Sequence, residues 1–399
     1  MAVTLANADK ALKSVYLDVI SDQIDKYSSP LLSRIKKTTD SVYGKDVKKL
    51  VIHGANTGIG AGSEDGNLPK SSGNKYVQLT SSIKNLYGTI EISDKAIRAS
   101  QHSTNAFVNL LNAEMEGLIK TSKLNFARMI YGNGTGKLFN VLGIDNGKIY
   151  ADNITAVREG MIVDVINDKT KEPVENGLGK TITHIDKTFG AVSLSGEAIT
   201  FEENLVDSII VCVQGSYNNE ITGLGAVMSN EMEEIYGLNK NAYSFLRPNR
   251  FHVYDILDDD KIETAIDEVE RNSGNTINMI ICSYSARRAF KRAMSKKRTY
   301  LDVQNFGYGY TGINFDGIPM VVDRYCPDDE MYLINTNDFE LHQLCDWQWL
   351  EDDKGAILKQ VPGKPVYTAT LVKYAELICC NPSGQGCIYG VNNLPEENA

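Results

Sequence analysis

The stretch that decides the fold is NAFVNLLNAEMEGLIKTSKLNFARMIYGNGTG, residues 105–136. Its apolar residues recur at steps of three, four and eight positions, which is the spacing of one face of an α-helix. We therefore predict a helix over Asn105–Tyr131, capped by Ser103 or Thr104 and ended by the glycines that follow. At 1.5 Å per residue it is about 40 Å long, which is typical of a spine for other elements. The apolar stripe consists of Phe107, Leu111, Met115, Leu118, Phe126 and Met129.

The whole chain has 399 residues, of which 42% are hydrophobic, so we expect two or three packed units with ordinary cores. No apolar run approaches the length of a membrane span, and residues 1–14 do not have the pattern of a secretory signal. Lys and Arg number 41 against 51 acids, for a net charge of −10. A chain this acidic is not expected to bind DNA over its whole surface.

The seven cysteines form no C-x-x-C pair, and their number is odd. Both features favour a reducing compartment over a disulfide scaffold, and the spacing does not fit a zinc site. The five histidines are far apart in sequence and are interpreted as structural or surface residues. No catalytic motif or metal cluster stands out. We therefore predict no enzyme activity and no catalytic, cofactor-binding or metal-binding residues.

Two segments before the helix lack a core of their own. Residues 1–46 form an arm, in which a thin apolar face over Ala6–Ile24 predicts a short helix that must lie on another surface. Residues 47–92 are expected to form an extended hairpin, with strands at Lys48–His53 and Lys75–Ile92 joined by a glycine-rich stretch. A two-stranded ribbon is marginal in water and exposes a sheet edge, so a partner surface is expected.

Four further segments complete an α+β fold. Residues 93–147 hold the spine helix, and 148–217 carry short, regularly spaced strands that predict a small inserted β-unit. Residues 218–335 mix helices and strands, and 336–399 hold two long extended runs. Helices are expected at Asp258–Arg271 and Ser285–Ser295, and strands at Met161–Ile166, Lys180–Asp186, Ala191–Leu194, Ser208–Val213, Asn278–Cys282, Gly317–Asp323, Glu330–Asn335, Phe339–Trp349 and Tyr367–Cys380.

Two glycine-rich motifs resemble cofactor loops. Val51–Gly60 reads VIHGANTGIG, and with Tyr236 and Lys240 it resembles the short-chain dehydrogenase pattern. That pattern needs a helix directly after the glycines, whose N-terminus faces the pyrophosphate, and Ala61–Pro69 is a poor helix former. Gly132–Lys137 lacks the glycine and the Ser or Thr of a phosphate loop, and it follows a helix, so we interpret it as a helix stop and turn.

The segment Arg287–Arg298 contains seven basic residues and no acid. On a helix, the four between Arg287 and Arg292 fall on neighbouring faces one turn apart, which is conceivable for phosphate binding. Aromatic residues are sparse in this segment. We therefore favour a solvated face, or a salt-bridging contact with acidic surface such as Asp258–Asp260, over DNA binding.

The order of the pieces resembles the major capsid protein family of tailed bacteriophages. That order is an arm, a glycine-tipped hairpin, a spine helix, an inserted β-unit and a mixed domain ending in long strands. The resemblance implies a peripheral domain around the spine helix and an axial domain at the five-fold or six-fold axis of a capsomer. It also implies that the extended loop reaches over the neighbouring subunit. The stretches that carry the resemblance cover nearly the whole chain: Leu86–Ser93, Ala96–Ser100, Glu114–Leu118, Tyr131–Gly136, Asn219–Leu224, Gly317–Asp323, Tyr325–Pro327, Tyr332–Thr336 and Pro362–Pro382.

The resemblance implies a structural function. The chain is expected to assemble with itself, as pentamers and hexamers, into an icosahedral head. This head encloses double-stranded DNA without sequence-specific binding, and needs no cofactor or membrane. Scaffold, portal and decoration proteins are the implied partners. The implied location is the virion, assembled in the host bacterial cytoplasm.

Covalent processing is known in this family. Some relatives cross-link a loop lysine to an asparagine, and Lys70, Lys75 and Lys84 are candidates by residue type alone. Other relatives remove an N-terminal scaffolding segment. Because residues 1–46 are too short for a large one, we expect either no cleavage or a separate scaffold.

Three alternatives stay open at this point. Encapsulins share the fold and form cargo shells in bacterial cytoplasm, so packaged DNA and a portal, instead of enzyme cargo, would identify a phage capsid. A dehydrogenase is the enzyme alternative and predicts NAD(H) binding. A DNA-binding protein that uses Arg287–Arg298 predicts DNA retention at low salt.

Overall fold

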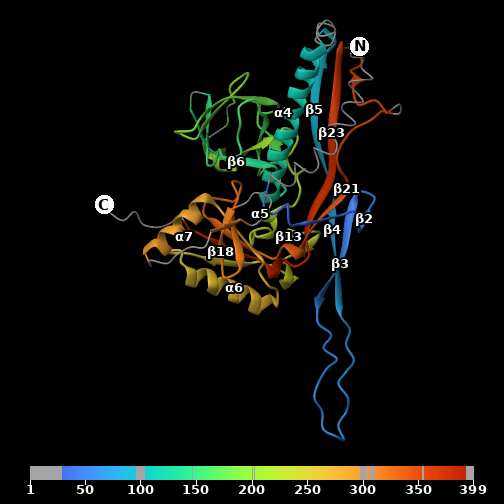
Figure 1. Ribbon diagram of the computed structural model, residues 1–399, viewed down its shortest axis with the longest axis vertical. Helices are drawn as coiled ribbons and strands as arrows, with labels where there is room; N and C mark the ends of the chain where they lie inside the picture. Colours follow the sequence, from blue (N-terminus) through green and yellow to red (C-terminus); the bar gives the residue numbers. More distant parts are fainter. Residues whose placement is uncertain are drawn as a thin grey trace.

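The computed structural model describes residues 29–95, 104–145, 147–199, 201, 203–296, 303–305, 311–352 and 355–391. One long helix, α4 (Thr104–Tyr131), lies beside the sheet with the longest strands and beside a barrel; a second large sheet lies below them, and a hairpin projects at the opposite end of the molecule from α4, as Figure 1 shows. The predicted spine helix is therefore confirmed to within one residue. No helix in the described ranges is long and apolar enough to cross a bilayer.

The sheet with the longest strands supports α4. Its central strand, β23 (Val366–Cys379), pairs antiparallel with β21 (Phe339–Trp349) on one side and with β5 (Lys84–Ser93) on the other. A Cβ added to Gly88 of β5 would lie 2.8 Å from Cδ1 of Leu118 in α4, so the glycine allows the helix to approach the strand closely. The sheet is completed by β1 (Lys36–Thr38) and β22 (Lys359–Gln360).

The hairpin is shorter than the sequence pattern predicted. β3 (Asp46–Gly54) pairs antiparallel with β4 (Lys75–Ser82), and the chain then passes through Ile83 into β5, which belongs to the long sheet. The prediction of one strand over Lys75–Ile92 was therefore wrong. The break is fixed by the pairing of β5 with β23, a contact between distant parts of the chain that a local alternating pattern does not reveal.

After α4 the chain folds into a closed ring of six strands. The ring closes where β10 pairs with β8, and its interior is filled by buried aliphatic residues such as Val163, Val165 and Val211. The sheet begins at Lys137, ahead of the insert start expected at residue 148, because the strand after α4 is itself a barrel strand. The strands are β6 (Lys137–Asp145), β7 (Lys148–Ala151), β8 (Ile162–Asn167), β10 (Lys180–Asp186), β11 (Ala191–Leu194) and β12 (Ile209–Val213), with β9 (Glu172–Pro173) attached to β8.

The third unit is a seven-stranded mixed sheet with α6 (Asp259–Ser273) and α7 (Tyr284–Lys296) on one face. Both helices share one core with that face, and the other face joins the core under α4. Asp258 caps α6 by accepting a hydrogen bond from the Lys261 backbone N–H, and Gly274 ends it in the left-handed conformation. In order across the sheet the strands are β15 (Asn249–His252), β24 (Gly386–Tyr389), β20 (Glu330–Ile334), β16 (Met279–Cys282), β19 (Ile318–Val322), β18 (Thr311–Phe315) and β17 (Val303–Asn305).

The arm is described from Ser29 onward. Leu31, Leu32 and Ile35 are buried in the core under α4, and β1 pairs parallel with β21. This part of the arm therefore packs on its own chain. The helix predicted at Ala6–Ile24 lies outside the described residues.

The other predicted helices and strands are present, with ends shifted by two residues at most, and the α+β fold class is confirmed. The remaining short elements are β2 (Val42–Tyr43), η1 (Glu203–Ser208), α5 (Leu224–Val227), β13 (Glu234–Ile235), β14 (Leu238–Asn239), η2 (Ser244–Leu246), η3 (Thr336–Asp338) and η4 (Pro382–Gly384).

Candidate assembly surfaces

The β3–β4 hairpin projects away from the body of the molecule (Figure 1). Every residue of its loop 55–74 is exposed except Gly58. Leu50, Ile52 and Tyr76 are 63%, 57% and 56% exposed. Leu50 and Ile52 lie two residues apart on β3, and Ile52 is opposite Tyr76 on β4, so the three side chains form one apolar face. An exposed apolar face of this kind is typical of a surface that binds a partner.

The loop of the hairpin extends this apolar character. Ile59 and Leu68 are 86% and 90% exposed. Two of the three lysines considered for cross-linking, Lys70 and Lys75, are exposed on the same hairpin. The third, Lys84, lies at the start of β5 and donates a hydrogen bond to the Asn218 carbonyl at 3.3 Å. A covalent link at any of them stays a prediction.

The base of the hairpin is held by Tyr236, a residue that sequence reasoning placed in a false cofactor motif. Tyr236 is buried and has a φ of 52° in the turn between β13 and β14. Its carbonyl accepts a hydrogen bond from the Thr80 N–H of β4 at 3.0 Å. Its hydroxyl donates to the Leu377 carbonyl at 3.2 Å and accepts from the Cys379 N–H at 3.0 Å. One residue therefore connects β4, through its carbonyl, to the end of β23, through its hydroxyl.

Two further contacts hold the base of the hairpin. The Lys49 ammonium of β3 lies 2.7 Å from the Glu340 carboxylate of β21. The His53 ring stacks on Phe245 with centroids 5.8 Å apart and meets Tyr243 edge-on at 5.4 Å. The direction of the hairpin is thus set at its base, and its apolar face and loop stay exposed.

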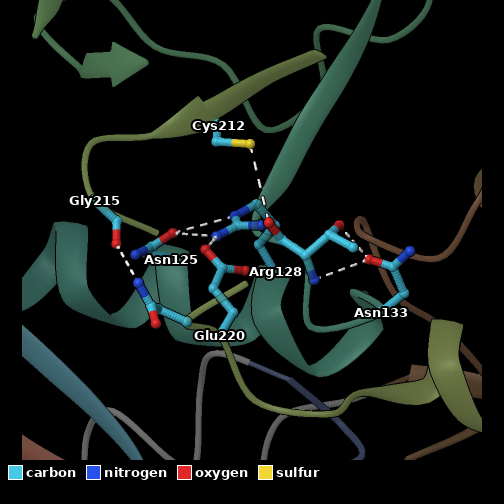
Figure 2. A network of polar contacts seen from close by, with 8 residues as sticks. Asn125, Arg128, Asn133, Cys212, Gly215 and Glu220 are labelled. Carbon is cyan, nitrogen blue, oxygen red and sulfur yellow. Dashed lines mark hydrogen bonds and ion pairs between the residues drawn. The ribbon is translucent and has the colours of Figure 1, made fainter. Parts of the chain in front are cut away.

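A polar network joins α4 to the chain leaving the barrel, as Figure 2 shows. The Arg128 guanidinium donates to Oδ1 of Asn125 at 2.9 and 3.1 Å and forms an ion pair with Glu220. The two charged side chains are only 9% and 2% exposed. Removing one charge would leave the other buried without compensation, so the network strongly favours this arrangement of barrel and spine.

The entry into the barrel depends on two glycines. Gly134 and Gly136 have φ values of +88° and +80°. A Cβ on Gly136 would also lie 2.4 Å from the Ser216 carbonyl oxygen. Glycine is therefore required at this position. Gly132–Lys137 is a turn between a helix and a strand, as predicted.

The other glycine motif does not form a dinucleotide site either. β3 ends at Gly54, and the loop 55–74 contains neither helix nor strand, so no helix N-terminus is available there. Tyr236 is engaged by backbone groups of β23. Lys240 donates to the carbonyls of Ala226 and Ser229 at 2.9 and 2.5 Å, and its burial lowers its pKa to about 8.

A buried carboxyl group lies on β23. Glu376 is fully buried, and its Oε1 accepts a hydrogen bond from the Thr222 N–H at 2.8 Å. Within the described chain its Oε2 has no hydrogen-bond partner. Burial raises the pKa of Glu376 to about 7. The sheet therefore contains a group that titrates near neutral pH.

Metal-binding and ligand-binding features are sparse. Among the described residues, no three His, Cys, Asp or Glu side chains gather in a way that could hold a metal ion. A hollow of about 290 Å³ lies at the end of α4, lined by Tyr131, Arg250 and Glu330 among others. Arg250 and Glu330 form an ion pair with each other at 3.4 Å, so these charges are satisfied internally.

The chain resembles solved capsid structures in its fold and no curated protein in its sequence. No protein-family model and no curated protein matches the chain. The capsid asymmetric unit of cyanophage A-1(L) superposes with a TM-score of 0.54 at 11% identity, covering 90% of both chains. The holo-SrpI encapsulin of Synechococcus elongatus PCC 7942 gives a TM-score of 0.45 at 8% identity, covering 94% of this chain and 92% of that one. The capsid of an empty GTA particle gives 0.46 at 9% identity, covering 90% and 95%.

Proposed function

We propose that this chain, which has the fold of the tailed-phage capsid proteins, is a shell-building subunit that functions by binding copies of itself. The β3–β4 hairpin carries the proposal. Its apolar face of Leu50, Ile52 and Tyr76 is more than half exposed in the single chain. A neighbouring copy that covers this face would remove it from water.

The mechanism is repetition of one contact. Each subunit offers its hairpin to a neighbour and receives the hairpin of another, which is a heterologous interface, and such interfaces generate rings when the rotation closes. Burial of each large apolar side chain contributes about 1.5–3 kcal/mol before the cost of association is subtracted. A single contact is therefore modest, and closure of a ring or shell makes many contacts cooperative.

The fixed base of the hairpin supports this mechanism. Tyr236, Lys49 and His53 hold its direction in the single chain, so less conformational entropy is lost on binding. In this account α4 and the long sheet form the peripheral domain of a capsomer, and the mixed sheet forms the axial domain. The barrel is then the inserted domain.

We further propose that the shell is the head of a virion, assembled in the host cytoplasm and enclosing double-stranded DNA. Its role is structural, with no catalytic step, cofactor or membrane. The net charge of −10 supports this, because tight binding of DNA by the wall would hinder packaging and release. Scaffold, portal and decoration proteins are the proposed partners besides the chain itself.

The test replaces the apolar face of the hairpin. In a triple variant, Leu50→Thr, Ile52→Thr and Tyr76→Thr remove the face and keep good strand formers. We expect this variant to stay unassembled in sedimentation velocity, with an unchanged circular dichroism spectrum. The control is Leu142→Thr with Phe189→Thr, which changes barrel residues that are 64% and 72% exposed and should assemble normally. Normal assembly of the triple variant would refute the role of the hairpin.

A further inference from the structure

The helices of the mixed sheet carry opposite charges. α6 contains six acidic and two basic residues, a net charge of −4. α7 contains five basic residues and no acid, a net charge of +5. Both helices pack on the same face of the sheet through apolar residues of one core, so the charged side of each is directed outward.

The acidic side of α6 presents Asp260, Glu263, Asp267 and Glu268, all exposed. Within the described chain none of these four carboxylates forms an ion pair or hydrogen bond. Glu263 and Asp267 are four positions apart, where like charges repel each other on a helix. An external group of opposite charge would therefore stabilise this surface.

The basic side of α7 presents Arg288, Lys291 and Arg292, also exposed. Arg288 is three and four positions before the other two, so the three cations repel each other. No acid lies in the first turn of α7, where one would interact favourably with the helix dipole. In the described residues these three cations have no anionic partner, and the last two basic residues of the run, 297 and 298, lie outside those residues.

The two charged surfaces lie toward opposite ends of the sheet. A Cβ on Gly386 of β24 would lie 2.9 Å from Val269 of α6, which places this helix over the β24 side. Phe290 of α7 meets Phe315 of β18 edge-on at 6.1 Å, which places that helix near the other end of the strand order. Figure 1 shows the two helices apart. Two copies side by side can therefore bring α6 of one against α7 of the next.

We propose that the acidic surface of α6 binds the basic surface of α7 on a neighbouring copy, joining the mixed sheets head to tail in a ring. The inference rests on the proposed shell function and names one of its interfaces. DNA is the other polyanion that would fit α7. A second copy is favoured because it also accounts for α6, whose acids DNA would repel, and because a heterologous contact of this kind closes rings.

The experiment reverses the charge of each helix surface, one at a time, in the full chain. One variant combines Arg288→Glu, Lys291→Glu and Arg292→Glu; the other combines Glu263→Lys, Asp267→Lys and Glu268→Lys. Each should assemble only at a concentration ~10-fold or more above that of the unmodified chain, because like charges then face each other.

Two further experiments test whether opposite charges restore the pairing of α6 with α7. A chain with both reversals restores opposite charges across the contact and should assemble near the original concentration. An equimolar mixture of the two reversed chains should also assemble, since every contact can pair one acidic with one basic helix. Folding of each variant is checked by circular dichroism before assembly is scored by sedimentation and negative-stain microscopy.

The outcomes separate the inference from the proposed function. If both reversed chains assemble like the unmodified chain, the inference is overturned and the shell function stands. If folded reversed chains fail and neither rescue restores assembly, the pairing of α6 with α7 is overturned. If reversal of α7 leaves assembly intact and abolishes retention of a DNA duplex, α7 is a nucleic-acid surface instead. If the unmodified chain forms no ring or shell, both proposals fail.

Discussion

Lys373 lies with its ammonium group against the Asp346 carboxylate, although its own side chain is completely buried. It also donates to Gln343 at 3.0 Å and lies 5.4 and 5.9 Å from the ring centres of Phe126 and Trp347. Burial lowers the pKa of Lys373 below its ordinary value. Burial also acts to raise the pKa of Asp346, but Lys373, Lys37 and the Trp347 N–H together outweigh it and hold this pKa well below the usual range. This pair fixes the sheet under α4.

The two halves of this pair are expected to differ in their effect on stability. Asp346→Asn leaves a buried ammonium without its counter-ion and should lower the free energy of unfolding by about 3–5 kcal/mol. Lys373→Met should cost less, because Asp346 is 25% exposed and keeps Lys37 at 3.1 Å. Urea unfolding followed by the fluorescence of Trp347 and Trp349, the only two tryptophans, measures both. A larger loss for Lys373→Met would contradict this assignment.

The Arg128–Glu220 pair should show strong coupling. Glu220→Leu leaves a buried guanidinium uncompensated and should cost about 3–5 kcal/mol, whereas Arg128→Met combined with Glu220→Leu should cost much less. A double-mutant cycle in urea measures this. The exposed pair Lys261–Asp255 is the control, and Asp255→Asn should change stability by about 1 kcal/mol or less. Additive effects of the two substitutions at the buried pair would rule out the coupling.

Glu376 should make stability depend on pH near neutrality. Its pKa is about 7 in the folded chain, against an ordinary value of 4.5 for a glutamate. Between these values the folded chain holds a proton that the unfolded chain has lost, so the contribution of Glu376 to stability is complete below pH 4.5 and is lost as pH rises through 7. The loss amounts to about 3 kcal/mol.

The measurement is the free energy of unfolding of the unassembled chain from pH 5 to pH 8. Its slope against pH should be smaller in Glu376→Gln than in the unmodified chain. The exposed control Glu91→Gln should keep the original slope, and equal slopes in both variants would exclude Glu376 as the cause.

Tyr236→Phe should loosen the base of the hairpin. The substitution leaves the Leu377 carbonyl and the Cys379 N–H buried without a partner, at a cost of about 1–3 kcal/mol. Hydrogen exchange should become faster at the Thr80 amide, which is bonded to the Tyr236 carbonyl, and stay unchanged in the barrel, for example at Val211. Uniform acceleration over the whole chain would indicate general destabilisation and not a specific role at the hairpin.

Local patterns predicted the elements well. α4, α6 and α7 follow from helical spacing of apolar residues, and β21 and β10 match their predicted limits because turn residues bound them. Pairing between distant segments could not be predicted in the same way. The strand β5 continues the alternation of β4 but belongs to another sheet, and β6 directly follows the spine helix but belongs to the barrel.

The residues that hold the candidate surfaces were the hardest to foresee. Tyr236 matched a dehydrogenase motif by chance, and its contacts with Thr80 and β23 exist only in three dimensions. Lys373 looked like an ordinary charged residue in a strand, since sequence does not show which side of β23 faces α4. In contrast, the apolar alternation of the hairpin was visible in the sequence, because it involves only neighbouring residues.

The contents of purified particles distinguish the two kinds of shell. Double-stranded DNA and a portal are expected for a phage head, and an enzyme cargo would instead identify an encapsulin-like compartment. The contents therefore decide which biological role the shell has, and either outcome is compatible with the fold and the self-assembly of the chain.

The most direct test of self-assembly is negative-stain electron microscopy of the chain expressed alone, combined with light scattering. Closed shells, rings of five or six subunits, or tubes are the predicted products. A stable, uniform dimer or tetramer with no larger species would contradict the account, because such a species satisfies its interfaces without building a wall.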